Sequence, residues 1–197
     1  SALRCFGVKI RREGFGKWRI NGVGIGGLIS PDKLIDVGNS GTSARLLCGL
    51  LSGHGFSSMV TGDNSLCSRP MVRVIEPLTQ MGATFHASDG DRLPMTITGN
   101  DNLMPITYEL PVASAQVKSA ILLAGLHAPG ATSVIELRPT RDHTERMLKY
   151  FGADITVEEI AAGNKITIIG QPELIPTEVT VPGDPSSAAF PVVAALL

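Results

Sequence analysis

The chain has 197 residues, a formal net charge of -1, and charged side chains at 18% of its positions. This balance provides no basic field for a nucleic acid, and no apolar run is long enough to span a membrane. A chain of this length can bury a sizeable core, so we expect a globular protein that binds neither nucleic acid nor membrane.

Three similar glycine-centred segments divide the chain. They are Phe6-Gly-Val-Lys9, Met81-Gly-Ala-Thr84 and Phe151-Gly-Ala-Asp154, spaced roughly 70–75 residues apart. In each, glycine stands where a helix C-cap belongs and a strand is expected to follow. A second strand is predicted to close each copy, at residues 18–20, 95–98 and 165–169. The pattern indicates a repeated structural unit.

Residues 36–45 (DVGNSGTSAR) predict a short strand, a glycine-rich turn and the start of a helix. Such a junction presents free backbone N–H groups and the positive end of a helix dipole, which together favour an anion. Gly41 would let a ligand approach the backbone, and Arg45 would add a fixed positive charge. The alternative is a well-capped helix without a ligand, and the segment alone leaves both interpretations open.

Arg69 stands directly before Pro70 at another predicted helix start. In that place its guanidinium could bind a carboxylate or a phosphate. The alternative is a surface arginine that pairs with Asp63, and the sequence leaves this open as well. The helix that follows carries charges on one face and is expected to lie outside.

The third copy repeats these features. Ser114 and Gln116 offer a hydroxyl and an amide at the start of an apolar helix over residues 117–125. Taken alone, Ser114 is best interpreted as an N-cap, but the repeat favours a second ligand-facing loop. Lys118 is expected to be solvated or to lie behind the ligand-facing residues.

Residues 140–145 (TRDHTE) open the outer helix of the third copy. Either Thr140 or Asp142 is expected to cap this helix, with Glu145 completing a capping box. Arg141 is then free to bind an anion. Acid–base catalysis by Asp142 and His143 is the less favoured interpretation, because no serine or cysteine nucleophile accompanies them.

These elements predict an α/β fold built from repeated βαβαββ units. The first helix of each unit is apolar nearly all round, so we expect buried parallel helices surrounded by sheets. Their N-termini would converge on one surface, which suits a multiply anionic ligand. The expected divisions are the second half of a first unit, a second unit, a third unit, and a crossover with the first helix of another domain, at residues 1–35, 36–107, 108–177 and 178–197.

The chain thus starts in the second half of one unit and stops after the first helix of another, which indicates a piece of a longer repeat protein. In the last segment, Asp184 is expected to cap the apolar helix. The 3 cysteines and 4 histidines are not at metal-ligand spacing, so no metal site or cofactor is predicted. Reduced, buried thiols and the lack of a recognisable leader favour a cytoplasmic protein.

Several segments together resemble the enolpyruvyl transferase family, most closely its EPSP synthase branch: residues 38–45, 68–70, 89–94, 113–120, 140–145 and 182–187. The resemblance implies two domains of three such units each. It also implies transfer of the enolpyruvyl group of phosphoenolpyruvate to the 5-hydroxyl of shikimate 3-phosphate, in a monomeric enzyme of aromatic amino-acid biosynthesis that needs no cofactor.

The resemblance assigns residues to both substrates. Shikimate 3-phosphate is expected to contact Ser114, Ala115, Gln116 and Arg141. Phosphoenolpyruvate, whose place glyphosate also takes, is expected to contact Asn39, Gly41, Arg69 and Gln116. A glycine at position 41 implies sensitivity to glyphosate.

The family's catalytic acids and bases have no counterpart in these residues, so we assign none and expect the chain alone to be inactive. Two alternatives remain open at this point. One is UDP-N-acetylglucosamine enolpyruvyl transferase, which carries a reactive cysteine in a region comparable to that of Cys67. The other is a ligand-binding module that does not catalyse.

Overall fold

A computed structural model describes residues 2–184, 191 and 193–195. The helices are α1 (Ala2–Cys5), α2 (Gly41–Ser52), α3 (Asn64–Cys67), α4 (Val72–Gln80), α5 (Ala115–Gly125) and α6 (His143–Tyr150). The strands are β1 (Lys9–Gly14), β2 (Lys17–Asn21), β3 (Ile35–Asp36), β4 (Ser57–Thr61), β5 (Thr84–Ser88), β6 (Arg92–Thr98), β7 (Thr107–Glu109), β8 (Ala131–Glu136), β9 (Ile155–Ile160) and β10 (Gly163–Ile169).

Two four-stranded sheets share one topology. Their strand orders are β3-β4-β6-β5 and β7-β8-β10-β9. In each sheet the first two strands are parallel and are joined through a helix, α2 or α5, while the other neighbours pair antiparallel. The expected α/β fold, with helices packed against sheets, is confirmed. The exact boundaries of the repeat at residues 36–107 and 108–177 stay a prediction.

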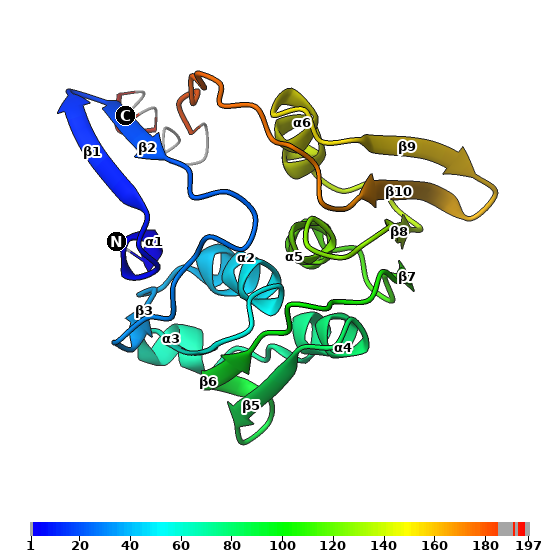
Figure 1. Ribbon diagram of the computed structural model, residues 1–197, viewed down its shortest axis with the longest axis horizontal. Helices are drawn as coiled ribbons and strands as arrows, with labels where there is room; N and C mark the ends of the chain where they lie inside the picture. Colours follow the sequence, from blue (N-terminus) through cyan, green and yellow to red (C-terminus); the bar gives the residue numbers. More distant parts are fainter. Residues whose placement is uncertain (1, 185–190, 192, 196–197) are drawn as a thin grey trace.

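The helices α2 and α5 lie side by side in the middle of the molecule, with the sheets around them (Figure 1). Both are largely buried, as their apolar sequences predict. They run in the same direction, because Thr42 meets Gln116 near their starts and Gly53 meets His127 near their ends. A side chain at Gly49 would collide with the carbonyl of Ala120, so glycine is required for this close helix contact. The two helix N-termini therefore open on the same side.

The outer helices α4 and α6 bury only one face each, through Val74, Pro77 and Leu78 in α4 and through Glu145 and Leu148 in α6. The glycines of the repeated segments follow α1, α4 and α6 with φ of +83° at Gly7, +109° at Gly82 and +89° at Gly152. Few other residues adopt this left-handed backbone, which ends a helix and directs the chain into the next strand. The expected C-caps are confirmed.

The start of α6 differs from expectation. Asp142 occupies the N-cap position, but its side chain makes no capping hydrogen bond. Thr140 donates its hydroxyl to Glu136 instead, and Glu145 turns inward to pair with Lys118. The predicted cap and capping box are therefore wrong, because a buried lysine attracts the carboxylate more strongly than the exposed backbone N–H groups do.

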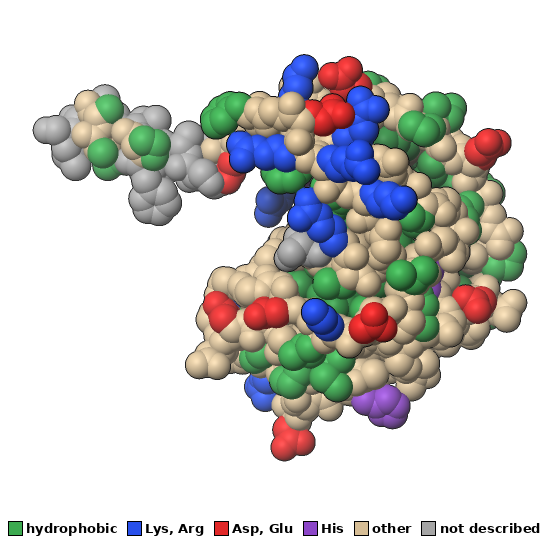
Figure 2. All heavy atoms as spheres, turned by 60° about the vertical axis from the view of Figure 1, so that its left-hand side comes forward, with side chains coloured by type: hydrophobic (Ala, Val, Ile, Leu, Met, Phe, Trp, Pro, Cys, Tyr) green, Lys and Arg blue, Asp and Glu red, His purple; other side chains and the backbone are tan. Residues whose placement is uncertain are grey.

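Charge is unevenly spread over the surface. Figure 2 shows Lys and Arg side chains gathered on the side turned forward, where the β1–β2 hairpin lies. The exposed basic residues of these strands are Lys9, Arg11, Arg12, Lys17 and Arg19. The near-neutral net charge thus includes a locally basic hairpin.

None of the described helices has the length and apolar character needed to cross a bilayer. Most of the helix that Asp184 was expected to cap lies outside the described residues.

Candidate functional site

The N-terminal ends of α2 and α5 open into one pocket of about 600 Å³. The lining residues are Asn39, Ser40, Gly41, Thr42, Arg45, Arg69, Pro70, Arg73, Ser114, Gln116 and Val117. Segments that the sequence analysis singled out separately thus meet at a single place. Among the described residues, the side chains that line the pocket include three arginines but no Asp, Glu, His or Cys.

Both helices begin with a serine cap at this pocket. The Ser43 backbone N–H donates to the Ser40 hydroxyl at 3.1 Å, and that of Val117 donates to the Ser114 hydroxyl at 3.4 Å. Because a cap satisfies only some of the free N–H groups in a first helical turn, the positive end of each dipole still faces the pocket. The capping interpretation is confirmed for both turns, and it is compatible with an anion site.

The side-chain amide of Gln116 joins the two helices. Its Nε2 donates to the Thr42 hydroxyl at 2.7 Å, and its Oε1 accepts from Arg45 Nη1 at 3.2 Å. Arg45 also donates to the carbonyls of Gly41 and Pro70. These bonds fix the orientation of the amide, which lies between the two helix starts.

Arg69 is held by a short chain of polar contacts. Its Nη2 donates to Asn39 Oδ1 at 3.2 Å and to the Ser65 hydroxyl at 3.3 Å. Asn39 in turn donates to Asp63 Oδ2 at 2.7 Å, and Asp63 caps α3 through the Leu66 N–H. The hydrogen bond from Asn39 is the main reason that the pKa of Asp63 is lowered. Asp63 therefore orients Arg69 through Asn39 rather than by the direct pairing considered as the alternative.

Three arginines, Arg45, Arg69 and Arg73, face this pocket. Within the described part of the chain, none of them forms an ion pair with a carboxylate. Burial lowers the pKa of Arg45; the Cys48 thiol opposes this effect, while the charges of Arg69 and Arg73 add to it. Positive groups outside any direct ion pair attract an anionic ligand, and guanidinium groups suit phosphate and carboxylate oxygens.

Gly41 lines the pocket without a side chain that would fill it. A Cβ atom at this position would lie 2.8 Å from Arg45 Nη1 and 3.4 Å from Arg69 Nη1. Such a methyl group would occupy the space between the two guanidinium tips. With glycine here, a ligand can reach both arginines without displacing either guanidinium tip.

The structure brings most, but not all, of the predicted site residues together. Asn39, Gly41, Arg69, Ser114 and Gln116 line the pocket. Ala115 is half-buried between Ser114 and Gln116. Arg141 is exposed in the segment between β8 and α6 and does not belong to the described lining. The ligand contacts themselves stay predictions.

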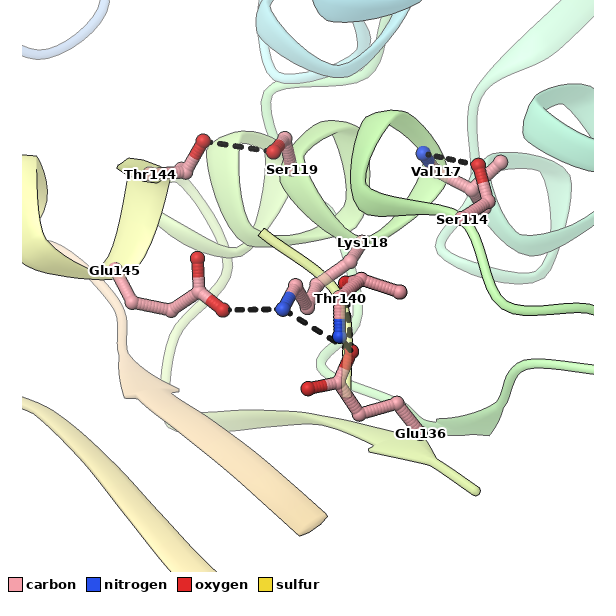
Figure 3. A network of polar contacts seen from close by, with 8 residues as sticks. All are labelled: Ser114, Val117, Lys118, Ser119, Glu136, Thr140, Thr144 and Glu145. Atoms are coloured by element: carbon pink, nitrogen blue, oxygen red, sulfur yellow. Dashed lines mark hydrogen bonds and ion pairs between the residues drawn. The ribbon is translucent and has the colours of Figure 1, made fainter. Parts of the chain in front are cut away.

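Arg73 and Thr42 also line the pocket, although neither was among the predicted site residues. The available signal was the place of Arg73 in the first turn of α4, directly after the segment that holds Arg69. Of the two expectations for Lys118, solvation is wrong, because this side chain is fully buried and pairs with Glu136 and Glu145 (Figure 3).

Comparisons with known proteins agree with this description. The sequence matches the family described as EPSP synthase (3-phosphoshikimate 1-carboxyvinyltransferase) over residues 1–197. It is 61% identical to a 3-phosphoshikimate 1-carboxyvinyltransferase of Parvibaculum lavamentivorans, over 99% of this chain and 44% of the relative. It is 56% identical to the 3-phosphoshikimate 1-carboxyvinyltransferase of Acidiphilium cryptum, over 100% of this chain and 44% of the relative.

Among solved structures, the EPSP synthase of Acinetobacter baumannii superposes with a TM-score of 0.89 at 52% identity. The match covers 96% of this chain and 42% of that structure. The chain thus spans less than half the length of these relatives.

Proposed function

The chain belongs to the EPSP synthase family, and we propose that the protein transfers the enolpyruvyl group of phosphoenolpyruvate to the 5-hydroxyl of shikimate 3-phosphate, with release of phosphate. The observation that carries the proposal is the pocket between α2 and α5. There, two helix N-termini and three arginines meet without a carboxylate in the described lining. Both proposed substrates carry a phosphate and a carboxylate, so the charge of the pocket suits them.

The proposed division of the site follows the two helices. Asn39, Gly41 and Arg69, around the start of α2, would contact phosphoenolpyruvate, while Ser114 and Ala115, at the start of α5, would contact shikimate 3-phosphate. The geometry supports a shared role for Gln116, because its amide lies between the two helix starts and is held by Thr42 and Arg45. Arg141 is proposed as a further contact for shikimate 3-phosphate.

The described pocket lining offers no acid or base for proton transfer, since it contains no Asp, Glu, His, Cys or Lys. Addition of the hydroxyl to the enolpyruvyl double bond and elimination of phosphate both require proton transfers. We propose that these groups belong to the part of the relatives' length that this chain does not span. The 197 residues alone are accordingly proposed to bind substrate without turning it over.

The competing transferase finds no support at Cys67. This thiol is half-buried and donates to the Gly62 carbonyl at 3.3 Å, and it is not among the described residues of the pocket. A reactive cysteine of a transferase would have to reach the substrate.

Turnover by the protein expressed from its complete gene tests the proposal. Phosphate release and the transferred enolpyruvyl group would be followed with phosphoenolpyruvate and shikimate 3-phosphate. Transfer to UDP-N-acetylglucosamine instead would establish the competing transferase. Binding of both substrates without any transfer would leave a binding module as the function.

Replacing Gly41 with alanine is expected to weaken phosphoenolpyruvate binding. The new methyl group would displace the guanidinium tips of Arg45 and Arg69, at a cost of about 1 kcal/mol, or roughly a fivefold rise in KM. Glyphosate inhibition of the wild type is expected, and the variant should need a higher inhibitor concentration. Initial rates at varied phosphoenolpyruvate, with and without glyphosate, measure both effects.

Gly22→Ala is the matched control, because a methyl group there meets nothing within 4 Å. It should leave both KM for phosphoenolpyruvate and the inhibition by glyphosate unchanged. If Gly41→Ala kept the wild-type KM and the wild-type inhibition, the proposed place of phosphoenolpyruvate at Gly41 would be wrong.

A further inference from the structure

A buried ion cluster of Lys118, Glu136 and Glu145 lies behind the pocket helix α5 (Figure 3). Lys118 Nζ is 3.1 Å from Glu136 Oε2 and 2.5 Å from Glu145 Oε1. The three side chains are exposed by only 1%, 4% and 6%, respectively. They come from three elements, so one ammonium group ties α5 to the end of β8 and to the first turn of α6.

One carboxylate oxygen extends the cluster to the neighbouring segment. Glu136 Oε2 accepts from the Thr140 backbone N–H at 3.2 Å and from the Thr140 hydroxyl at 2.7 Å, in addition to the lysine. Thr140 directly precedes Arg141 in the segment 137–142, which connects β8 to α6. Glu136 and Glu145 therefore hold this segment from both of its ends.

The segment itself is mostly exposed. Residues 137–139 and 141–142 are on the surface, and the side chain of Asp142 makes no capping bond to α6. Beyond the cluster, a hydrogen bond of 2.7 Å between Ser119 and Thr144 joins the start of α6 to α5. The position of Arg141 thus depends on buried polar contacts rather than on apolar packing of its own segment.

We infer that the Lys118–Glu136–Glu145 cluster is a positioning device, which sets Arg141 at a fixed distance from the N-terminal end of α5. Lys118 follows Gln116 by two residues on the same helix. The cluster therefore connects the two parts of the proposed shikimate 3-phosphate site, Ser114 to Gln116 on one side and Arg141 on the other. This inference rests on the proposed function.

The chemistry of the cluster agrees with a positioning role. Burying one ammonium and two carboxylates is costly, and well-packed apolar residues often serve stability equally well or better. A buried ion cluster, however, tolerates only a narrow range of geometries, since every misplaced charge is left without a partner. Such a cluster fixes the relative positions of the three elements that contribute to it.

Thr140→Val, made in the protein expressed from its complete gene, tests the positioning role. This change removes the hydroxyl bond to Glu136 and leaves the three charged groups in place. We expect KM for shikimate 3-phosphate to rise about 10-fold, while kcat and KM for phosphoenolpyruvate stay within about twofold. Hydrogen exchange should become faster in residues 137–144 only. Thr140→Ser, which keeps the hydroxyl, should restore the wild-type values.

Thr167→Val is the matched control, because it removes a hydroxyl bond of 2.8 Å to Ser133 between strands β8 and β10. It should change neither KM for shikimate 3-phosphate nor the hydrogen exchange of residues 137–144. An active wild type with an unchanged KM for shikimate 3-phosphate in Thr140→Val overturns the positioning role alone. A wild type that transfers no enolpyruvyl group overturns the proposed function, and with it the substrate assigned to Arg141.

Discussion

Replacing Arg69 with alanine is expected to lower kcat/KM for phosphoenolpyruvate by about 100- to 1,000-fold. Arg69 lines the pocket, is half-buried, and is oriented by Asn39 and Ser65. Its guanidinium has no carboxylate partner within the described residues, so its charge is available to the ligand. Steady-state rates at varied phosphoenolpyruvate and saturating shikimate 3-phosphate measure the loss.

Two further variants make this result specific. Arg69→Lys keeps the charge but loses the planar fork, so it should fall between wild type and alanine. Arg19→Ala removes an exposed arginine that pairs with Glu13 on the hairpin, and it should leave the rates unchanged. An Arg69→Ala enzyme within about threefold of the wild type would remove Arg69 from the proposed substrate site.

The fold was largely predictable, because its main signals are local. The apolar sequences of α2 and α5 predict burial, and the glycines at positions 7, 82 and 152 predict the ends of helices. The short helix α3 was not predicted, since four residues carry no periodicity. The common strand order of the two sheets could be expected only from the repeat, because pairing between distant strands leaves no local pattern.

The candidate site was predictable in its parts but not in its connections. The sequence identified the turn before α2, the turn before α5 and Arg69 as candidates for anion binding, and the repeat predicted that the helix N-termini converge on one surface. The bonds that assemble them join residues far apart, such as Arg45 with Gln116 and Arg69 with Asn39. The N-cap that the isolated sequence around Ser114 favoured is present, and Ser40 caps α2 in the same way.

The errors concern buried charge. Solvation was one of the two expectations for Lys118, because most charged residues lie at the surface. Glu145 was expected to complete a capping box, because of its spacing from the predicted cap. Their partnership depends on α5 and α6 packing together, which no short sequence window shows. Arg141 was expected to be free to bind an anion because Thr140 or Asp142 would cap α6; that cap is absent, and the contact of Arg141 with the substrate stays a prediction.

Lys118→Met is expected to destabilise the protein by about 3–5 kcal/mol, because it leaves two carboxylates buried without their ammonium. Glu145 already has one buried oxygen without a hydrogen-bond partner in the described structure, so this carboxylate has no alternative donor at hand. Urea unfolding of the protein expressed from its complete gene, at fixed pH, measures the change. Lys149→Met, on the exposed side of α6, is the control and should stay within about 0.5 kcal/mol of the wild type.

The triple variant Lys118→Met, Glu136→Gln, Glu145→Gln separates the loss of charge balance from the loss of packing. All three charges are then absent, so most of the lost stability should return. The position of Arg141 should not return with it, because neutral amides hold Thr140 less firmly than a carboxylate does. Recovered stability together with a raised KM for shikimate 3-phosphate would show that the cluster serves geometry more than stability. A single Lys118→Met variant that loses less than about 1 kcal/mol would contradict the buried charge imbalance on which this reasoning depends.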